Sequence, residues 1–311
     1  MNKLNFYLRA RMSVFFNQSH PKALLRISEE DAEDYLQSQL SVDIAKLPVG
    51  GVRFALRLNT RGRVLAGAYL LRKGDESFLL YSRGNEASEW MTLLEENVVA
   101  DEVEFTDESS SWTAQVIGGS GVEEFLESQN LKIPPMGQFL ESENGVLFQD
   151  ERLPGKTFTF LNKSGKPLVT ESGECRKIGW EDIHKERIQA GLFSVPEEIG
   201  PDNLPQEGGL ENGSVDFQKG CYLGQETMAR IHATGKVRMQ AKVVTWDATQ
   251  SPTLPSPVLQ AGKPVATLKS AVSASNGTFL GVLVVRANLI PALEAEEFAL
   301  PGENAERIRA L

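Results

Sequence analysis

The residues with the clearest chemical potential lie in one short stretch, Lys219-Gly220-Cys221-Tyr222-Leu223-Gly224-Gln225-Glu226. It places Cys221, one of only two cysteines in the chain, between a lysine, a tyrosine and two glycines. A cysteine reacts as its thiolate, which a nearby cation and a helix N-terminus both favour. Lys219 is the candidate cation, and residues 225–229 are predicted to form a short helical turn. We therefore predict a reactive, partly exposed thiol at Cys221, against the alternative of a buried structural cysteine.

The second cysteine, Cys175, has charged neighbours in Gly173-Glu174-Cys175-Arg176-Lys177. These charges indicate a surface position, and we expect no function for this thiol. The two cysteines are far apart and form no C-x-x-C pair, so neither a structural zinc site nor a disulfide framework is expected. A reducing cytoplasm is the compartment that fits this cysteine usage.

Polar side chains follow the cysteine closely in sequence. Glu226, Arg230 and His232 come within eleven residues of it. The chain from Met228 onward is predicted to become strand, which would place Arg230 and His232 on one face. They would then form either a solvated hairpin face or a rim that binds an anion.

Two further pairs of residues are candidates for binding. Arg187 and Gln189 lie near the end of a predicted helix, where an arginine can satisfy backbone carbonyls or, together with the amide, read a heterocycle or a carboxylate. Arg61 and Arg63 flank Gly62 at a predicted hairpin tip, where polar residues are common without any function.

Composition excludes several classes of protein. The 311 residues carry a net charge of −10, which argues against non-specific binding to nucleic acid or to an anionic membrane but leaves room for a local basic groove that binds a small anion. No segment approaches the ~20 apolar residues of a membrane span. Residues 1–20 lack the apolar core and cleavage site of a secretory signal, while their lack of acids leaves a transit peptide open. Three histidines and no H-E-x-x-H motif make a histidine-rich metal site implausible, and we expect no metal.

The hydrophobic pattern predicts two αβ lobes followed by a small all-β domain. In the first lobe a helix with its N-cap at Ser28 and a helix over 86–99 enclose an antiparallel meander, with strands at 52–58, 63–71 and 77–81. In the second lobe the pattern predicts strands at 112–117, 146–148 and 157–161 and helices at 122–126 and 180–191. Strands at 241–246, 265–268 and 278–285 then suggest a barrel.

The stretch from Lys219 to Glu226 meets the motif K-G-C-Y-x-G-Q-E without a mismatch, and with it the chain resembles the YgfZ family. These are folate-binding proteins related to the glycine-cleavage T-protein and to a mitochondrial homologue that assists iron–sulfur cluster assembly. The resemblance covers most of residues 25–290. Its supporting segments are 35–43, 58–66, 186–191, 204–207 and 227–238.

The resemblance implies an α+β, T-protein-like fold: two αβ lobes with antiparallel sheets plus a C-terminal β-barrel around a central channel. It implies a folate-binding region over residues 1–228 and a barrel domain over 229–311. Cys221 is the functional thiol by this resemblance, with tetrahydrofolate as the cofactor in the channel. The implied folate-binding residues are Arg63, Arg187, Gln189, Lys219, Tyr222, Gln225, Glu226 and Arg230.

The sequence also departs from the T-protein pattern. The acidic residue expected after the hairpin turn is replaced within Ala66-Gly67-Ala68, and a pterin-contacting glutamate is replaced by Gln189. An amide can still hydrogen-bond a pterin, but it cannot accept from two donors as a carboxylate does. The resemblance therefore implies a folate pocket without aminomethyl transfer.

We thus expect a cytoplasmic, monomeric, tetrahydrofolate-binding accessory protein for iron–sulfur cluster assembly or repair in client enzymes. It would not be a conventional enzyme, and its partners would be folate and iron–sulfur client or assembly proteins, with no nucleic acid and no membrane. One alternative is a folate-dependent one-carbon transferase of the aminomethyl type. The other is a non-catalytic protein-interaction scaffold.

Overall fold

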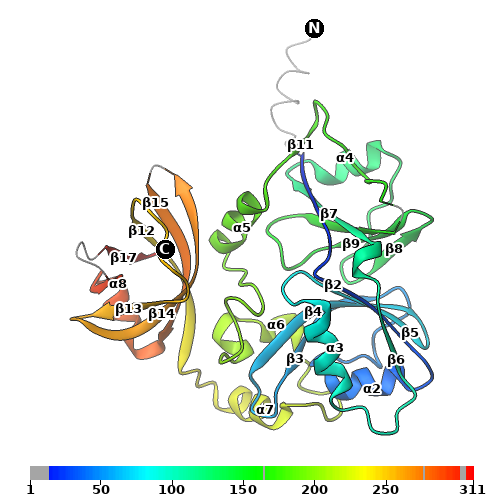
Figure 1. The fold of residues 1–311 in the computed structure, drawn as a ribbon, viewed down its shortest axis with the longest axis horizontal. Helices are drawn as coiled ribbons and strands as arrows, with labels where there is room; N and C mark the ends of the chain where they lie inside the picture. The colour runs from blue at the N-terminus through cyan, green and yellow to red at the C-terminus, as the bar shows by residue number, and fades with distance from the viewer. Residues whose placement is uncertain (1–13, 164, 276, 302–305) are drawn as a thin grey trace.

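The structure is a computed structural model that describes residues 14–163, 165–275, 277–301 and 306–311. The expectation that the N-terminal stretch is no secretory signal therefore lies, up to residue 13, outside the described residues. Within them, two lobes with mainly antiparallel sheets stand beside a closed barrel, with helix α5 (Trp180–Gln189) between the lobes and the barrel (Figure 1). The predicted α+β class, with antiparallel sheets and a C-terminal barrel, is confirmed.

The first lobe is a five-stranded sheet in the order β3-β4-β5-β2-β6. The predicted meander is confirmed as β3 (Val52–Leu58), β4 (Val64–Gly74) and β5 (Ser77–Ser82). The other strands are β2 (Ala23–Ser28) and β6 (Glu104–Asp107). The helices α2 (Ala32–Gln39) and α3 (Ala87–Glu95) cover the sheet through apolar residues such as Tyr35, Leu36 and Trp90. The predicted cap at Ser28 is wrong, because this residue still pairs within β2 and the helix begins at Ala32.

The second lobe is a six-stranded sheet in the order β11-β1-β7-β10-β9-β8. The chain enters it first with β1 (Val14–Ser19), before the first lobe is built, and returns with β7 (Thr113–Gly119). The remaining elements are β8 (Phe139–Ser142), β9 (Gly145–Gln149), β10 (Thr157–Asn162), β11 (Cys175–Lys177) and α4 (Val122–Ser128). All pairs are antiparallel except β1 with β11.

The C-terminal strands close into a barrel in the order β12-β15-β14-β13-β16-β17. Their bounds are β12 (Met239–Asp247), β13 (Ser256–Gln260), β14 (Lys263–Ser275), β15 (Thr278–Arg286), β16 (Phe298–Ala299) and β17 (Arg307–Ala310), with helix α8 (Ile290–Glu294) before β16. Trp246, Leu268, Leu283 and Phe298 fill its interior. Two short helices precede the barrel, α6 (Glu211–Ser214) and α7 (Gln225–Thr234).

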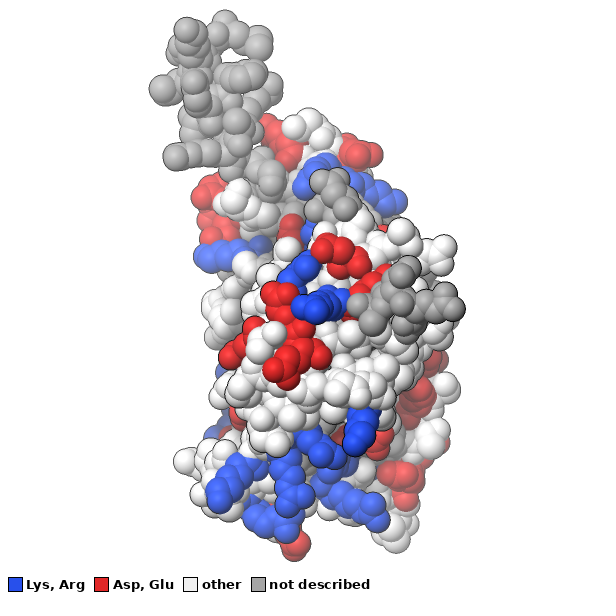
Figure 2. Space-filling view, turned by 90° about the vertical axis from the view of Figure 1, so that its left-hand side faces the viewer, with Lys and Arg blue, Asp and Glu red and all other residues white. Residues whose placement is uncertain are grey.

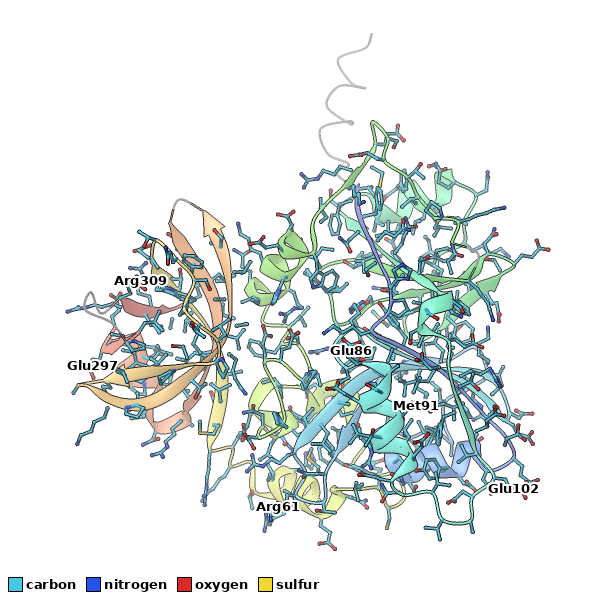
Figure 3. The ribbon with its side chains drawn as sticks, in the orientation of Figure 1. Arg61, Glu86, Met91, Glu102, Glu297 and Arg309 are labelled. Atoms are coloured by element: carbon cyan, nitrogen blue, oxygen red, sulfur yellow. The ribbon has the colours of Figure 1, made fainter. Side chains whose placement is uncertain are left out.

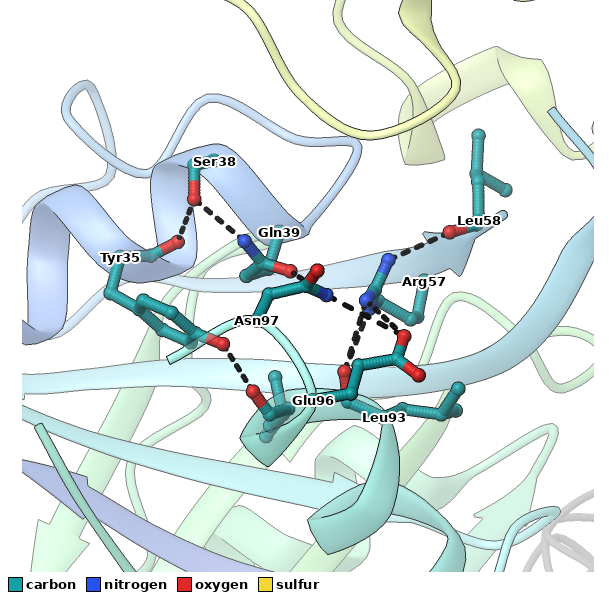
Figure 4. A network of polar contacts seen from close by, with 9 residues as sticks. Tyr35, Ser38, Gln39, Arg57, Leu58, Leu93, Glu96 and Asn97 are labelled. Carbon is teal, nitrogen blue, oxygen red and sulfur yellow. Dashed lines mark hydrogen bonds and ion pairs between the residues drawn. The ribbon is translucent and has the colours of Figure 1, made fainter. Parts of the chain in front are cut away.

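Two buried cations hold the C-terminal ends of helices α3 and α2, where unpaired carbonyls carry partial negative charge. Arg57 on β3 donates from Nη2 to Leu93 O at 3.0 Å and to Glu96 Oε1 at 3.0 Å (Figure 4). Lys219 donates from Nζ to the carbonyls of Gln37, Leu40 and Val42 at 2.6–2.7 Å. The loop that carries Cys221 is thereby fixed to the end of α2.

The prediction that the chain becomes strand from Met228 onward is wrong up to residue 238, because the next strand begins at Met239. Residues 225–234 form α7, so Arg230 and His232 do not lie on a strand, and side chains two apart on a helix do not share a face. The predicted domain boundary at 228/229 falls inside this helix and stays a prediction.

Cys175 is also not at the surface, because its side chain is 1% exposed within β11 while Arg176 and Lys177 are exposed. Burial, together with the charge of Glu171, raises the pKa of Cys175 to about 11.

Candidate functional site

A cavity of about 260 Å³ opens between the first lobe, α5 and residues 193–197; we call it the aromatic cavity. Its lining includes the aromatic residues Phe54, Tyr69, Tyr81, Trp180 and Phe193 and the cations Lys22, Arg83, Arg152 and Arg187. Pockets that enclose a whole drug-sized ligand measure roughly 300–1,000 Å³. The aromatic cavity is therefore large enough for the planar head group of a ligand, while the rest of that ligand lies outside.

Arg83 enters the cavity wall from the turn after β5 and is paired with the buried Asp150. The Arg83 Nη1 atom lies 2.5 Å from Asp150 Oδ2, and Tyr69 and Thr159 donate their hydroxyls to the same carboxylate at 2.7 Å. Burial acts to raise the pKa of Asp150, but Arg83 and these donors outweigh it and lower that pKa. The charged guanidinium of Arg83 then lies 5.8 Å from the centre of the Trp180 ring, a cation–π distance.

Arg187 lines the same cavity but forms a buried, bidentate ion pair with Glu198. The nitrogen–oxygen distances are 2.8 and 2.9 Å. Glu198 also accepts from Ser194 N at 2.7 Å and from the Ser270 hydroxyl of barrel strand β14 at 2.6 Å. Burial acts to raise the pKa of Glu198, but the hydrogen bonds from His184, Arg187 and Ser270 hold it at about 2. Arg187 is thus part of a network that joins the lobes to the barrel.

Two hydroxyls beside the cavity, Tyr81 Oη and Ser194 Oγ, are buried and form no well-aligned hydrogen bond with a described residue, although the Arg83 guanidinium is near enough to Tyr81 to act on its pKa. Leaving such a group unpaired costs roughly 1–3 kcal/mol. Burial raises the pKa of Tyr81, so its hydroxyl is a neutral donor. Neither oxygen has accessible surface in this conformation, so a polar molecule inside the cavity would reach them only after neighbouring side chains shift.

The surroundings of Ala66 and Gly67 on β4 show whether a carboxylate side chain would fit after the hairpin turn. Ala66 is fully buried in the core on the opposite face of β4, whereas Gly67 lines the cavity. A Cβ atom placed on Gly67 would lie 2.7 Å from the Phe54 ring and 3.0 Å from Val195, closer than side chains pack. Among the described residues that line the cavity, Glu197 is the one carboxylate, and its side chain is exposed.

The second region is the loop of Cys221. Cys221 is exposed, as predicted, and lies four residues before the start of α7. Lys219, the predicted cation beside the thiol, is instead held by the three carbonyls at the end of α2, and burial lowers its pKa to about 8. Tyr222 is buried, with its ring centre 5.0 Å from the Lys219 Nζ atom, and Gln225 donates to Lys219 O at 3.5 Å. These side chains shape the loop and leave the thiol at its surface.

The other predicted binding residues do not meet in one place. Gln189 ends α5 exposed and does not line the aromatic cavity, although Arg187 does. Glu226 is exposed on α7, and His232 stacks on Phe217 with 3.9 Å between ring centres. Arg63 and Arg230 line a different and larger cavity of about 1,450 Å³, which we call the basic groove.

The sequence pattern does not predict Arg83 and Ser194, which line the aromatic cavity, or Asp150 and Glu198, the buried carboxylates that pair with its arginines. The sequence offers a weak signal for Arg83, because the cluster Arg83-Gly84-Asn85 directly follows the buried strand β5. Asp150 has no comparable signal, since its partner is 67 residues away. Within the part of the chain that the structure describes, no three His, Cys, Asp or Glu side chains gather as a metal site, and no helix is long and apolar enough to cross a membrane.

Comparison with known proteins agrees with this architecture. Residues 9–132 match the GCVT N-terminal domain. The structure of the glycine cleavage system aminomethyltransferase T from Bartonella henselae superimposes with a TM-score of 0.79 over 99% of this chain and 87% of that one, at 16% identity. The fold is therefore that of the T-protein.

Sequence relatives make the relationship more specific. An iron–sulfur cluster assembly factor IBA57 homolog of Cryptococcus neoformans is 28% identical over 252 residues, which cover 74% of this chain and 66% of the relative. The tRNA-modifying protein YgfZ of Photorhabdus laumondii is 24% identical over 215 residues, which cover 68% of this chain and 65% of the relative. The chain is thus related to the YgfZ proteins, as its octapeptide indicated, and spans slightly less than two thirds of these relatives' lengths.

Proposed function

We propose that this protein binds tetrahydrofolate and serves as an accessory factor for iron–sulfur cluster assembly or repair in client enzymes. The observation that carries the proposal is the aromatic cavity, in which planar rings and a paired guanidinium line a half-open pocket beside two buried hydroxyls. A pterin ring would stack on the aromatic side chains and hydrogen-bond the hydroxyls of Tyr81 and Ser194.

The relatives' names support the second half of the proposal. One is called an iron–sulfur cluster assembly factor and another a tRNA-modifying protein. A client that modifies tRNA and carries an iron–sulfur cluster would connect the two descriptions. In this proposal Cys221 is the exposed group that acts on the client, while the folate occupies the cavity.

We further propose that the chain does not transfer an aminomethyl group. That reaction needs a carboxylate where β4 faces the folate, and Gly67 has no room there for a side chain. Ala66→Asp would instead bury an unpaired charge in the lobe core, so it should destabilise the protein without creating activity. A folate-dependent methylene-transfer assay on the unmodified protein tests this, and measurable turnover would favour the transferase.

Binding itself can be tested with variants that remove one hydroxyl each. Ser194→Ala and Tyr81→Phe delete hydroxyls that form no well-aligned hydrogen bond with a described residue, so the folded protein should lose little stability. If a pterin uses these hydroxyls, each variant should bind tetrahydrofolate roughly two- to tenfold more weakly. Arg187→Ala is a poorer test, because it leaves Glu198 buried without its counter-charge.

A further inference from the structure

The side chains that line the basic groove carry more positive charge than the acids beside them can neutralise. It is lined by six cations, Arg61, Arg63, Arg230, Lys236, Arg238 and Arg286, against two acids, Asp202 and Glu207. Arg63 donates to Asp202 O at 2.6 Å and lies 3.5 Å from Glu207. The other five cations are exposed and make no ion pair with any described residue.

This concentration stands out because the whole chain carries a charge of −10. Figure 2 shows Lys and Arg gathered at the lower end of the face that carries the barrel, and Figure 3 places Arg61 at the lower end of the molecule, near α7. Cations that share a groove reinforce one another's field and raise the local concentration of anions. Four of the five unpaired groups are arginines, whose planar fork pairs bidentately with carboxylates or phosphates.

The groove is built next to the loop of Cys221. Its hairpin, residues 59–63, packs on α7: a Cβ atom on Gly62 would lie 3.1 Å from Thr227, and one on Gly224 would lie 2.6 Å from Asn59 O. Gly224 follows Cys221 by three residues, and Thr227 lines the groove. The groove and the Cys221 loop thus adjoin through the first turn of α7, although Cys221 itself does not line the groove.

We infer that the basic groove is a docking surface for an acidic segment of a partner protein, which it holds beside Cys221. The inference rests on the proposed function, since it assigns the place where a client or assembly protein meets the thiol. A volume of about 1,450 Å³ exceeds the ~1,000 Å³ upper range of small-molecule pockets, so an extended segment fits it better. A carboxylate segment is favoured over single-stranded nucleic acid because no aromatic side chain lines the groove for base stacking, among the residues described.

The test uses the thiol as a reporter. A synthetic peptide of Asp, Glu and Gly carries a cysteine activated as its 2-thiopyridyl disulfide. The Cys221 thiolate attacks the peptide sulfur, a new protein–peptide disulfide forms, and pyridine-2-thione leaves. Docking raises the effective concentration of the peptide, so the acidic peptide should react roughly tenfold faster than a Ser/Gly peptide of equal length at low salt. In 1 M salt, where the screening length is about 3 Å, this advantage should disappear.

Matched variants locate the effect. Arg61→Glu with Arg238→Glu should abolish the rate advantage of the acidic peptide, while Arg176→Glu with Lys177→Glu, the same charge change at exposed positions of β11, should preserve it. The neutral peptide should react equally with all variants. Equal losses in both double variants, or an acidic peptide no faster than the neutral one, would overturn the inference.

Two further measurements separate this inference from others. The Arg61/Arg238 variant should bind tetrahydrofolate as tightly as the wild type does. If the wild type binds no tetrahydrofolate, the proposed function is overturned but the docking surface is not. Tight binding of transfer RNA that is lost in the same variant, with no acceleration by the acidic peptide, would replace the protein partner with nucleic acid.

Discussion

The aromatic cavity and the basic groove are both lined by arginines. In the cavity two of them form ion pairs with buried carboxylates, whereas most groove arginines are exposed and make no ion pair with a described residue. In the cavity, Arg83 and Arg187 each pair with a fully buried carboxylate, Asp150 or Glu198. In the groove, Arg61 and Arg238 stand in solvent without a described partner. A buried charge must be paired because its desolvation is expensive, whereas an exposed one is solvated by water. The cavity's charges therefore hold the fold and shape a pocket, and the groove's charges remain available to an outside anion.

The comparison predicts that the largest loss of stability follows from breaking a cavity pair. Asp150→Asn leaves Arg83 without its counter-charge and should lower the free energy of unfolding by about 3–5 kcal/mol. Arg238→Gln in the groove should change it by less than about 0.5 kcal/mol. Urea unfolding of the two variants measures both, and equal effects would contradict the distinction between the regions.

A related prediction concerns acid. The pKa of Glu198 lies near 2 in the folded protein, against an ordinary value of 4.5. The stability that this carboxylate contributes is therefore complete above pH 4.5 and is lost as the pH falls toward 2, by on the order of 3 kcal/mol. Between pH 6 and pH 3, the free energy of unfolding should fall less steeply for Glu198→Gln than for the wild type. Parallel curves would show that the Arg187–Glu198 pair does not set the acid sensitivity.

The two thiols should differ in accessibility. A thiol reagent should label Cys221 rapidly in the native protein, and Cys221→Ala should fold normally while losing that fast phase. Cys175 is buried and its pKa is raised, so it should react only through local opening. Fast labelling of the Cys221→Ala variant would contradict the buried position of Cys175.

Much of the fold could be predicted from local pattern. The alternation in residues 52–82 specified the meander, and Tyr35 and Leu36 specified the face of α2. The exposed position of Cys221 followed from its glycine-rich loop. Arrangements fixed by distant partners could not be foreseen, such as the pairing of β1 with β7 and the Arg83–Asp150 ion pair.

Two errors have identifiable physical causes. Cys175 is buried although charged residues flank it, because adjacent side chains on a strand point to opposite faces, so Arg176 need not share its environment. Lys219 is not the partner of the neighbouring thiol that its position in the sequence predicts, because the carbonyls of Gln37, Leu40 and Val42 accept from its ammonium group. In both cases the tertiary neighbours, and not the adjacent residues, decided the outcome.

The central claim is that tetrahydrofolate occupies the aromatic cavity, and calorimetric titration of the wild type beside Ser194→Ala, Tyr81→Phe and Cys221→Ala tests it most directly. The account predicts saturable binding by the wild type, two- to tenfold weaker binding by the two hydroxyl variants, and unchanged binding by Cys221→Ala. Saturating ligand should also raise the melting temperature of the wild type, because it binds only the native state. The absence of both heat and thermal stabilisation, or binding that neither hydroxyl variant weakens, would contradict the claim.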